Sequence, residues 1–193
     1  MKNTLGLIVL ALLLIFATPN QSIAQYKHSE AFEKGITVID LNTSFGTYRD
    51  KAFVTQRMPI FLGAEYGINN DISAGLFGGW NQRTYKTVNS FAYDVNYLYY
   101  GGRFSLHLTS LLRKHTILKF NPHKVDVYGT IYVGRQVARQ QTFSGAGYLD
   151  SGATNIFGGY VGAKVYTNYQ VGFLVELGAG PYGIMNVGVC YKF

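Results

Sequence analysis

Two residues in this chain have the types and spacing of a hydrolytic pair. Ser105 and His107 are two positions apart, so in an extended strand both side chains lie on the same face. A serine beside an imidazole can act as a nucleophile, and Glu65 could orient the histidine. Both residues are expected deep on the enclosed face of their strand, far from the place where a lipid substrate would arrive. We therefore predict no catalytic residue.

A second set of ionisable residues lies in segments that are otherwise apolar on one face. An unpaired charge in an enclosed space would cost several kcal/mol. We therefore predict that these residues face one another in the protein interior and form a network of ion pairs with a structural role. The predicted members are Asp40, Glu65, Arg103, Lys164 and Glu176.

Other motifs that could carry chemistry are not supported by their context. Residues 178–183 match G-x-G-x-x-G, but a strand rather than a helix is expected to follow, so no phosphate site results. The four histidines, at positions 28, 107, 115 and 123, lack the Cys or Asp neighbours of a metal site. Cys190 is the sole cysteine, which excludes an intramolecular disulfide. The sequence predicts no cofactor and no metal.

Alternation of apolar and polar residues with a period of two is the main structural signal. It recurs in eight segments separated by turn-rich stretches, which is typical of a transmembrane barrel. In the last segment, for example, Val187 and Val189 alternate with Gly188 and Cys190. The predicted strands are 35–48, 58–67, 72–83, 94–108, 125–137, 154–166, 171–180 and 184–193.

The apolar face of these strands is predicted to point outward. A soluble barrel or sandwich would place apolar residues inside, yet here the opposite face carries the charges, and burying charges without partners is costly. In lipid, an apolar exterior is required, and closure of the sheet satisfies all backbone groups. The fold class is therefore predicted as all-β, an eight-stranded antiparallel up-and-down transmembrane β-barrel.

The connections agree with this topology. Links 68–71 and 167–170 are short and rich in turn-forming residues, whereas 49–57, 84–93 and 138–153 are longer. An even number of strands places both termini in the periplasm, with the longer loops outside. The exception is the long periplasmic link 109–124. It is basic and free of acidic residues, and it could lie against phospholipid headgroups or dock a protein partner. Its basic residues are Arg113, Lys114, Lys119 and Lys124.

The beginning of the chain predicts export. Lys2 precedes an apolar run over 5–17 and a small-x-small site at 22–24, which predicts a signal peptide over 1–24 and a barrel domain over 25–193. Removing Lys2 from 17 basic residues leaves 16 against 10 acidic ones, a formal charge of +6. This balance suits contact with lipid or lipopolysaccharide phosphates, and after export no nucleic acid is expected as a partner.

Three sequence features carry a family resemblance: the terminal Tyr191-Lys192-Phe193, the Gly162-Ala163-Lys164 strand before a tight turn, and residues 176–180 before the last hairpin. With them the chain resembles the small eight-stranded outer-membrane barrels of the OmpX and OmpA-transmembrane-domain type, particularly the barrel-domain proteins of Bacteroidota. The resemblance implies location in the outer membrane of a Gram-negative cell. It also implies that Tyr191 and Phe193 form the signal recognised by the barrel-assembly machinery.

The expected function follows from the width of the barrel. Eight strands leave an interior that side chains can fill, so an open porin-like channel is not predicted. We expect a structural or interaction role in the cell envelope, in integrity, adhesion or partner docking through loops. One alternative is a minor pore or transport component. Another, less favoured, is a lipid-modifying enzyme like the lipid A palmitoyltransferase and deacylase, which are also small barrels.

Overall fold

The computed structural model describes residues 30–46, 53–86, 92–109, 112, 121, 123–140, 152–180 and 183–193. Their strands form a single antiparallel sheet. No helix in this part of the chain is long and apolar enough to cross a membrane. The strands are β1 (Thr37–Phe45), β2 (Phe53–Gln56), β3 (Ile60–Gly67), β4 (Ile72–Lys86), β5 (Ala92–His107), β6 (Val125–Gln140), β7 (Ala153–Tyr166), β8 (Val171–Ala179) and β9 (Met185–Lys192).

The sheet closes on itself through the pairing of β4 with β5. Both β2 and β3 pair with β4, one after the other along its length, so together they form one interrupted strand of the barrel. Counting them as one gives eight strands, which confirms the predicted fold class. The prediction that 49–57 is entirely a link is wrong, because β2 lies within it. A strand of four residues is too short for alternation to reveal.

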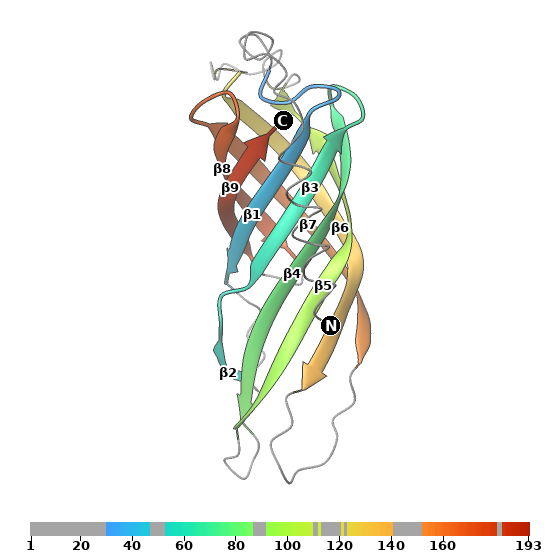
Figure 1. The fold of residues 1–193 in the computed structure, drawn as a ribbon, viewed down its shortest axis with the longest axis vertical. Coiled ribbons are helices and arrows are strands. Elements are labelled where there is room, and N and C mark those ends of the chain that lie inside the picture. Colours follow the sequence, from blue (N-terminus) through green and yellow to red (C-terminus); the bar gives the residue numbers. More distant parts are fainter. Residues whose placement is uncertain are drawn as a thin grey trace, which may run out of the picture.

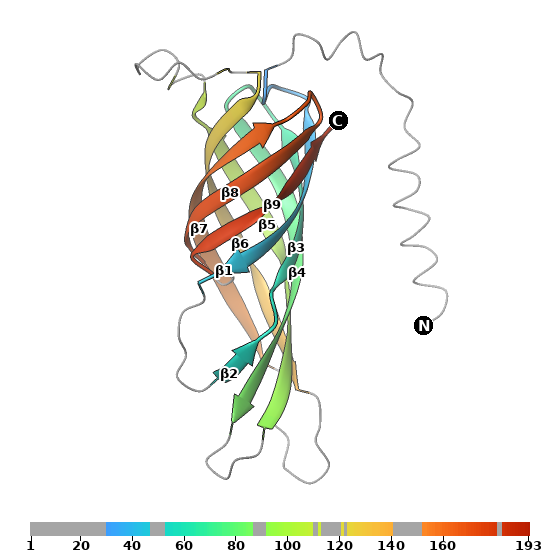
Figure 2. The same ribbon diagram turned by 90° about the vertical axis from the view of Figure 1, so that its left-hand side faces the viewer.

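The barrel has two unlike ends (Figures 1 and 2). The turn end holds the links 68–71 and 167–170 and the C-terminal residue Phe193. At the opposite end, called the extended end here, β4 and β5 continue well past β1, β8 and β9 (Figure 2). Strands β4 to β7 have 14 to 16 residues each and form what is called the tall wall here. Strands β1, β8 and β9 have 8 to 9 residues each and form the low wall.

Both tight turns use an asparagine in the same way. The Asn69 side-chain oxygen accepts hydrogen bonds from the backbone N–H groups of Asp71 and Ile72, at 2.8 and 2.7 Å. The Asn168 oxygen accepts from Gln170 and Val171, at 2.9 and 2.6 Å. Asparagine favours turns because its side chain can replace a strand partner in this manner. These two residues therefore fix where the flanking strands end.

The alternation places apolar side chains on the outside and charged ones inside. Along β3 exposed and buried residues alternate, so that Leu62 is 51% exposed while Glu65 is buried. The outer surface is apolar over β1, β3, β8 and β9, as a lipid-facing surface must be. On the face of β4 that carries Trp80, the next residues toward the extended end are Gln82 and Thr84, which donate hydrogen bonds to Asp94. The apolar band therefore ends near Trp80.

Candidate functional site

The centre of the lumen is occupied by the guanidinium of Arg103, on β5. It contacts three carboxylates, with N···O distances of 2.6 Å to Asp40, 2.5 Å to Glu65 and 3.2 Å to Glu176. All four side chains are at most 1% exposed. The carboxylates come from β1, β3 and β8, so one side chain links strands on opposite sides of the barrel.

Lys164 supplies the second cation of this cluster. Its ammonium donates to Glu65 at 2.8 Å and lies 4.4 Å from the centre of the Tyr128 ring. The Ser105 hydroxyl donates to the other oxygen of Glu65 at 2.6 Å. Glu65 thus contacts both cations, and each of its oxygens has a hydrogen-bond donor or an ion-pair partner. The five residues predicted to meet are brought together as one connected cluster, called the lumen charge network here.

The network has one more anion than it has cations: three carboxylates against two cations give a formal charge of −1. Neutral donors surround the carboxylate that is least tightly paired, Glu176. Tyr128 and Asn186 each donate to it at 2.8 Å, and Tyr132 donates at 3.2 Å. Hydrogen bonds to an ionised group are stronger than neutral ones, so these donors offset part of the cost of burying the extra charge.

The network also depends on a glycine that leaves space in the lumen. Gly63 faces the lumen on β3, and a Cβ placed there would lie 2.7 Å from Asp40 Oδ2 and 2.9 Å from Arg103 Nη1. Any larger residue at this position would displace the shortest hydrogen-bonded ion pair of the network. The glycine therefore makes room for the contact between Asp40 and Arg103.

An aromatic layer fills the lumen between the network and the extended end. Its rings pack edge to face or tilted, with centroids 5.2 Å apart for Phe77 and Tyr132 and 5.6 Å apart for Tyr132 and Tyr160. Such geometries suit the charge distribution of aromatic rings. The buried members are Phe61, Phe77, Tyr99, Tyr132, Ile156 and Tyr160. Side chains therefore close the lumen between the network and the extended end.

The histidine considered as part of a hydrolytic pair has other partners. His107 Nδ1 lies 2.9 Å from Asp126, and Nε2 lies 3.0 Å from the hydroxyl of Ser73, not of Ser105. This is the order of groups that activates a serine in hydrolases. However, Ser73 is fully buried and the ring of Phe32 stacks on His107 with centroids 3.3 Å apart. No space is left for a substrate, so we interpret these contacts as structural.

The chain before β1, residues 30–36, closes the turn end of the lumen and is called the N-terminal segment here. Ala31, Phe32 and Ile36 are at most 5% exposed. The backbone carbonyl of Glu30 accepts from Lys192 Nζ at 3.0 Å, and Gly35 N–H donates to the carbonyl of Gly67 at 2.9 Å. The segment is therefore packed into the barrel as part of its interior.

Replacing Gly67 with alanine should release the N-terminal segment. A Cβ at this position would lie 2.6 Å from the carbonyl oxygen of Glu33 and 3.1 Å from the Phe32 ring. Because backbone cannot shift as easily as a flexible side chain, we expect the segment to leave the lumen while the barrel stays closed. Hydrogen exchange should then show lost protection over 30–36 and unchanged protection in β4 to β7. Equal protection of the segment in both proteins would contradict this.

The predicted assembly signal lies at the turn end. Tyr191 faces the outside of β9 and Phe193 follows the strand, with their rings edge to face at 4.6 Å between centroids. Of the basic link, Lys124 is exposed, whereas Arg113, Lys114 and Lys119 lie outside the described residues. The predicted signal peptide also lies outside them.

Comparison with known proteins bears on the fold. OprG, an outer-membrane protein of Pseudomonas aeruginosa, has a TM-score of 0.53 and 11% sequence identity, with 84% of this chain and 97% of OprG covered. The chain has the fold of an outer-membrane β-barrel. Together with the apolar exterior, this fold supports a location in the bacterial outer membrane.

Two further solved structures are similar at lower scores. The N-terminal barrel domain of Pseudomonas aeruginosa OprF has a TM-score of 0.46 and 13% identity over 83% of this chain and 99% of that domain. Ail of Yersinia pestis, in complex with the heparin analogue sucrose octasulfate, has a TM-score of 0.44 and 15% identity over 83% of this chain and 99% of Ail. No family model matches the sequence, and no curated protein matches it either.

Sequence reasoning missed several buried polar residues. Asp126 and Lys192 are fully buried in the lumen but were not among the predicted interior charges. Asp126 and Lys192 do alternate with apolar residues in their strands, so the signal that identified the other charges was present. The N-terminal segment carried no comparable signal, because its fit depends on contacts with β3, β5 and β9.

Proposed function

We propose that this protein is a non-conducting outer-membrane barrel with a structural and interaction role in the cell envelope. The observation that carries this proposal is the filled lumen. From the turn end, it contains the N-terminal segment, the lumen charge network and the aromatic layer in succession. No chemistry on a substrate is assigned to these groups, because the ionised side chains are buried and contact one another.

In this function the lumen charge network holds the barrel closed. Its members come from β1, β3, β5, β7 and β8. Each ion pair joins two strands that are not neighbours in the barrel. The network would thereby make rigid the part of the barrel from which the tall wall extends beyond the apolar band. Binding residues in proteins are often on loops that such a rigid scaffold positions.

Conductance in planar lipid bilayers tests the proposal. Because three layers of side chains fill the lumen, we expect insertion of the purified barrel to give no steady single-channel conductance. Exchanging Phe61 and Phe77 together for alanine removes two rings of the aromatic layer but leaves the charge network and its tyrosine donors, so that variant should also stay closed. Steady channels from the unaltered protein would contradict the proposal and favour a pore or transport component.

The partners proposed for this function are those of the envelope. The apolar exterior contacts outer-membrane lipid, and the basic chain suits lipopolysaccharide phosphates. Tyr191 and Phe193 are proposed as the signal read by the assembly machinery. Lys124, with the rest of the basic link, is proposed to face lipid headgroups or a periplasmic protein.

A further inference from the structure

Strand β7 has one edge that is paired only in part. Toward β6 its ladder is continuous from Ala153 to Val165. Toward β8 the ladder begins at Gly159, opposite Ala179, because β8 belongs to the low wall. Among the described strands, none pairs with this second edge over the six residues from Ala153 to Gly158.

Hydrogen bonds along β7 show which backbone groups face that edge. The carbonyl of Gly152 and the N–H of Tyr166 bond toward β6, whereas the N–H of Thr167 bonds toward β8. Strand backbone groups alternate sides, and the β6 ladder has no register shift in between. Even-numbered residues therefore bond to β6, and the N–H and C=O groups of Ala153, Asn155 and Phe157 point to the free edge.

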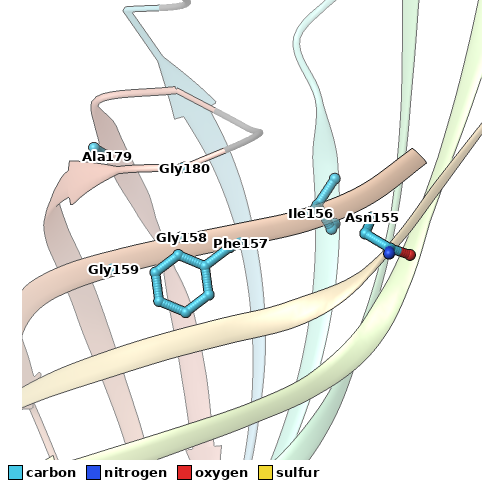
Figure 3. A pocket seen from close by; sticks show the side chains of 7 residues that line it. All are labelled: Asn155, Ile156, Phe157, Gly158, Gly159, Ala179 and Gly180. Atoms are coloured by element: carbon cyan, nitrogen blue, oxygen red, sulfur yellow. The ribbon is translucent and has the colours of Figure 1, made fainter.

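A recess lies between this edge and the end of β8. Its volume is about 590 Å³, within the range of ligand sites. Figure 3 shows residues 155–159 of β7 on one side of the recess and Ala179 and Gly180 on the other. None of the lining residues is charged. Phe157, 70% exposed, and Ile156, 8% exposed, lie on opposite faces of β7.

The other edge of the same tall wall is protected against pairing. At that edge β4 pairs with β2, which has only four residues and a register shift between Phe53 and Thr55. Arg57 and Pro59 follow it directly. Short strands, bulges, charges and prolines are the features by which proteins blunt exposed sheet edges. The free edge of β7 has none of them.

We propose that the free edge of β7 binds an extended, uncharged peptide segment of another protein, which adds to the barrel wall as a strand. The added strand would follow the end of β8 toward the extended end and continue the antiparallel ladder on β7. Backbone hydrogen bonds to Ala153, Asn155 and Phe157 supply affinity, and the side chains that enter the recess supply selectivity. Alternating backbone donors and acceptors match a peptide, whereas an acyl chain satisfies none of them. This inference deepens the interaction role proposed above.

Hydrogen exchange on the whole barrel in lipid nanodiscs gives the first test. In the free protein, the amides of Ala153, Asn155 and Phe157 should exchange fast, while those of Thr154 and Ile156 should be protected by β6. If the odd-numbered amides are already protected without a ligand, the chain's own residues cover the edge and the proposal is wrong.

Binding of short neutral peptides with alternating valine and threonine, labelled with a fluorophore, gives the second test. Asn155→Pro removes one N–H from the free edge and leaves the β6 ladder intact, since the lost group does not point to β6. Loss of that bond should weaken peptide binding about tenfold, and Asn155→Ala, which keeps the backbone, should leave it within about twofold.

Three results would overturn strand addition. These are absence of peptide binding, equal binding by the proline variant, and displacement of the peptide by a fatty acid with no effect of proline. The last would indicate an acyl-chain site. None of these results would contradict the proposed non-conducting barrel. Conversely, steady channels in bilayers would contradict that barrel but would leave the proposal for the β7 edge unaffected.

Discussion

Replacing Arg103 with methionine should lower the free energy of unfolding by about 3–5 kcal/mol, the usual cost of removing one partner of a buried ion pair. Methionine fills part of the space but leaves Asp40, Glu65 and Glu176 with Lys164 as the remaining cation of the network. Three buried carboxylates then face one another in the lumen. Unfolding by urea in liposomes, followed by tryptophan fluorescence of Trp80, measures the change.

Two controls separate this effect from a general loss of packing. Arg135→Met removes a guanidinium that is exposed on the outside of β6, so it should change the stability by no more than about 0.5 kcal/mol. Combining Arg103→Met with Asp40→Asn and Glu176→Gln neutralises the two carboxylates that lose their cation and keeps the pair of Glu65 with Lys164, so it should restore part of the loss. If Arg103→Met unfolds at the same urea concentration as the unaltered protein, the lumen charge network does not stabilise the barrel.

The exchange Leu76→Arg should destabilise the barrel by about 2–4 kcal/mol, the cost of arginine on the lipid face near the middle of a bilayer. Leu76 is 71% exposed and lies midway between Ile72 and Trp80 on the outer face of β4. In a water-soluble protein, an exposed leucine could become arginine at almost no cost. The size of the effect therefore reports which solvent surrounds the strand.

The matched control for this exchange is Asn155→Arg. Asn155 also faces outward, but it lies on the tall wall beyond the apolar band, opposite the exposed Arg135. Arginine at this position stays in water, so the free energy of unfolding should change by no more than about 0.5 kcal/mol. Equal effects of the two exchanges in liposomes would contradict a lipid-facing surface around Leu76.

The lumen shows how far a candidate site can be predicted from single strands. The charged residues on the face opposite the apolar row could be identified, because alternation decides which side of a strand each residue occupies. Their partners could not be assigned. Ser105 and His107 share a face, as expected, but the hydroxyl of Ser105 reaches Glu65 while His107 contacts Ser73 and Asp126. Strand tilt and stagger in the closed barrel decide which rows meet.

By itself the sequence determined the class of fold, the number of barrel strands and the face on which each side chain lies, because a period of two is a local property of an extended chain. Only the tertiary structure decided what depends on neighbours. It divided the second strand into β2 and β3 and stacked Phe32 on His107. It also left the β7 edge from Ala153 to Gly158 without a partner among the described strands, beyond the end of β8. Those features follow from register, strand length and closure, which join residues far apart in the chain and leave no pattern within any one strand.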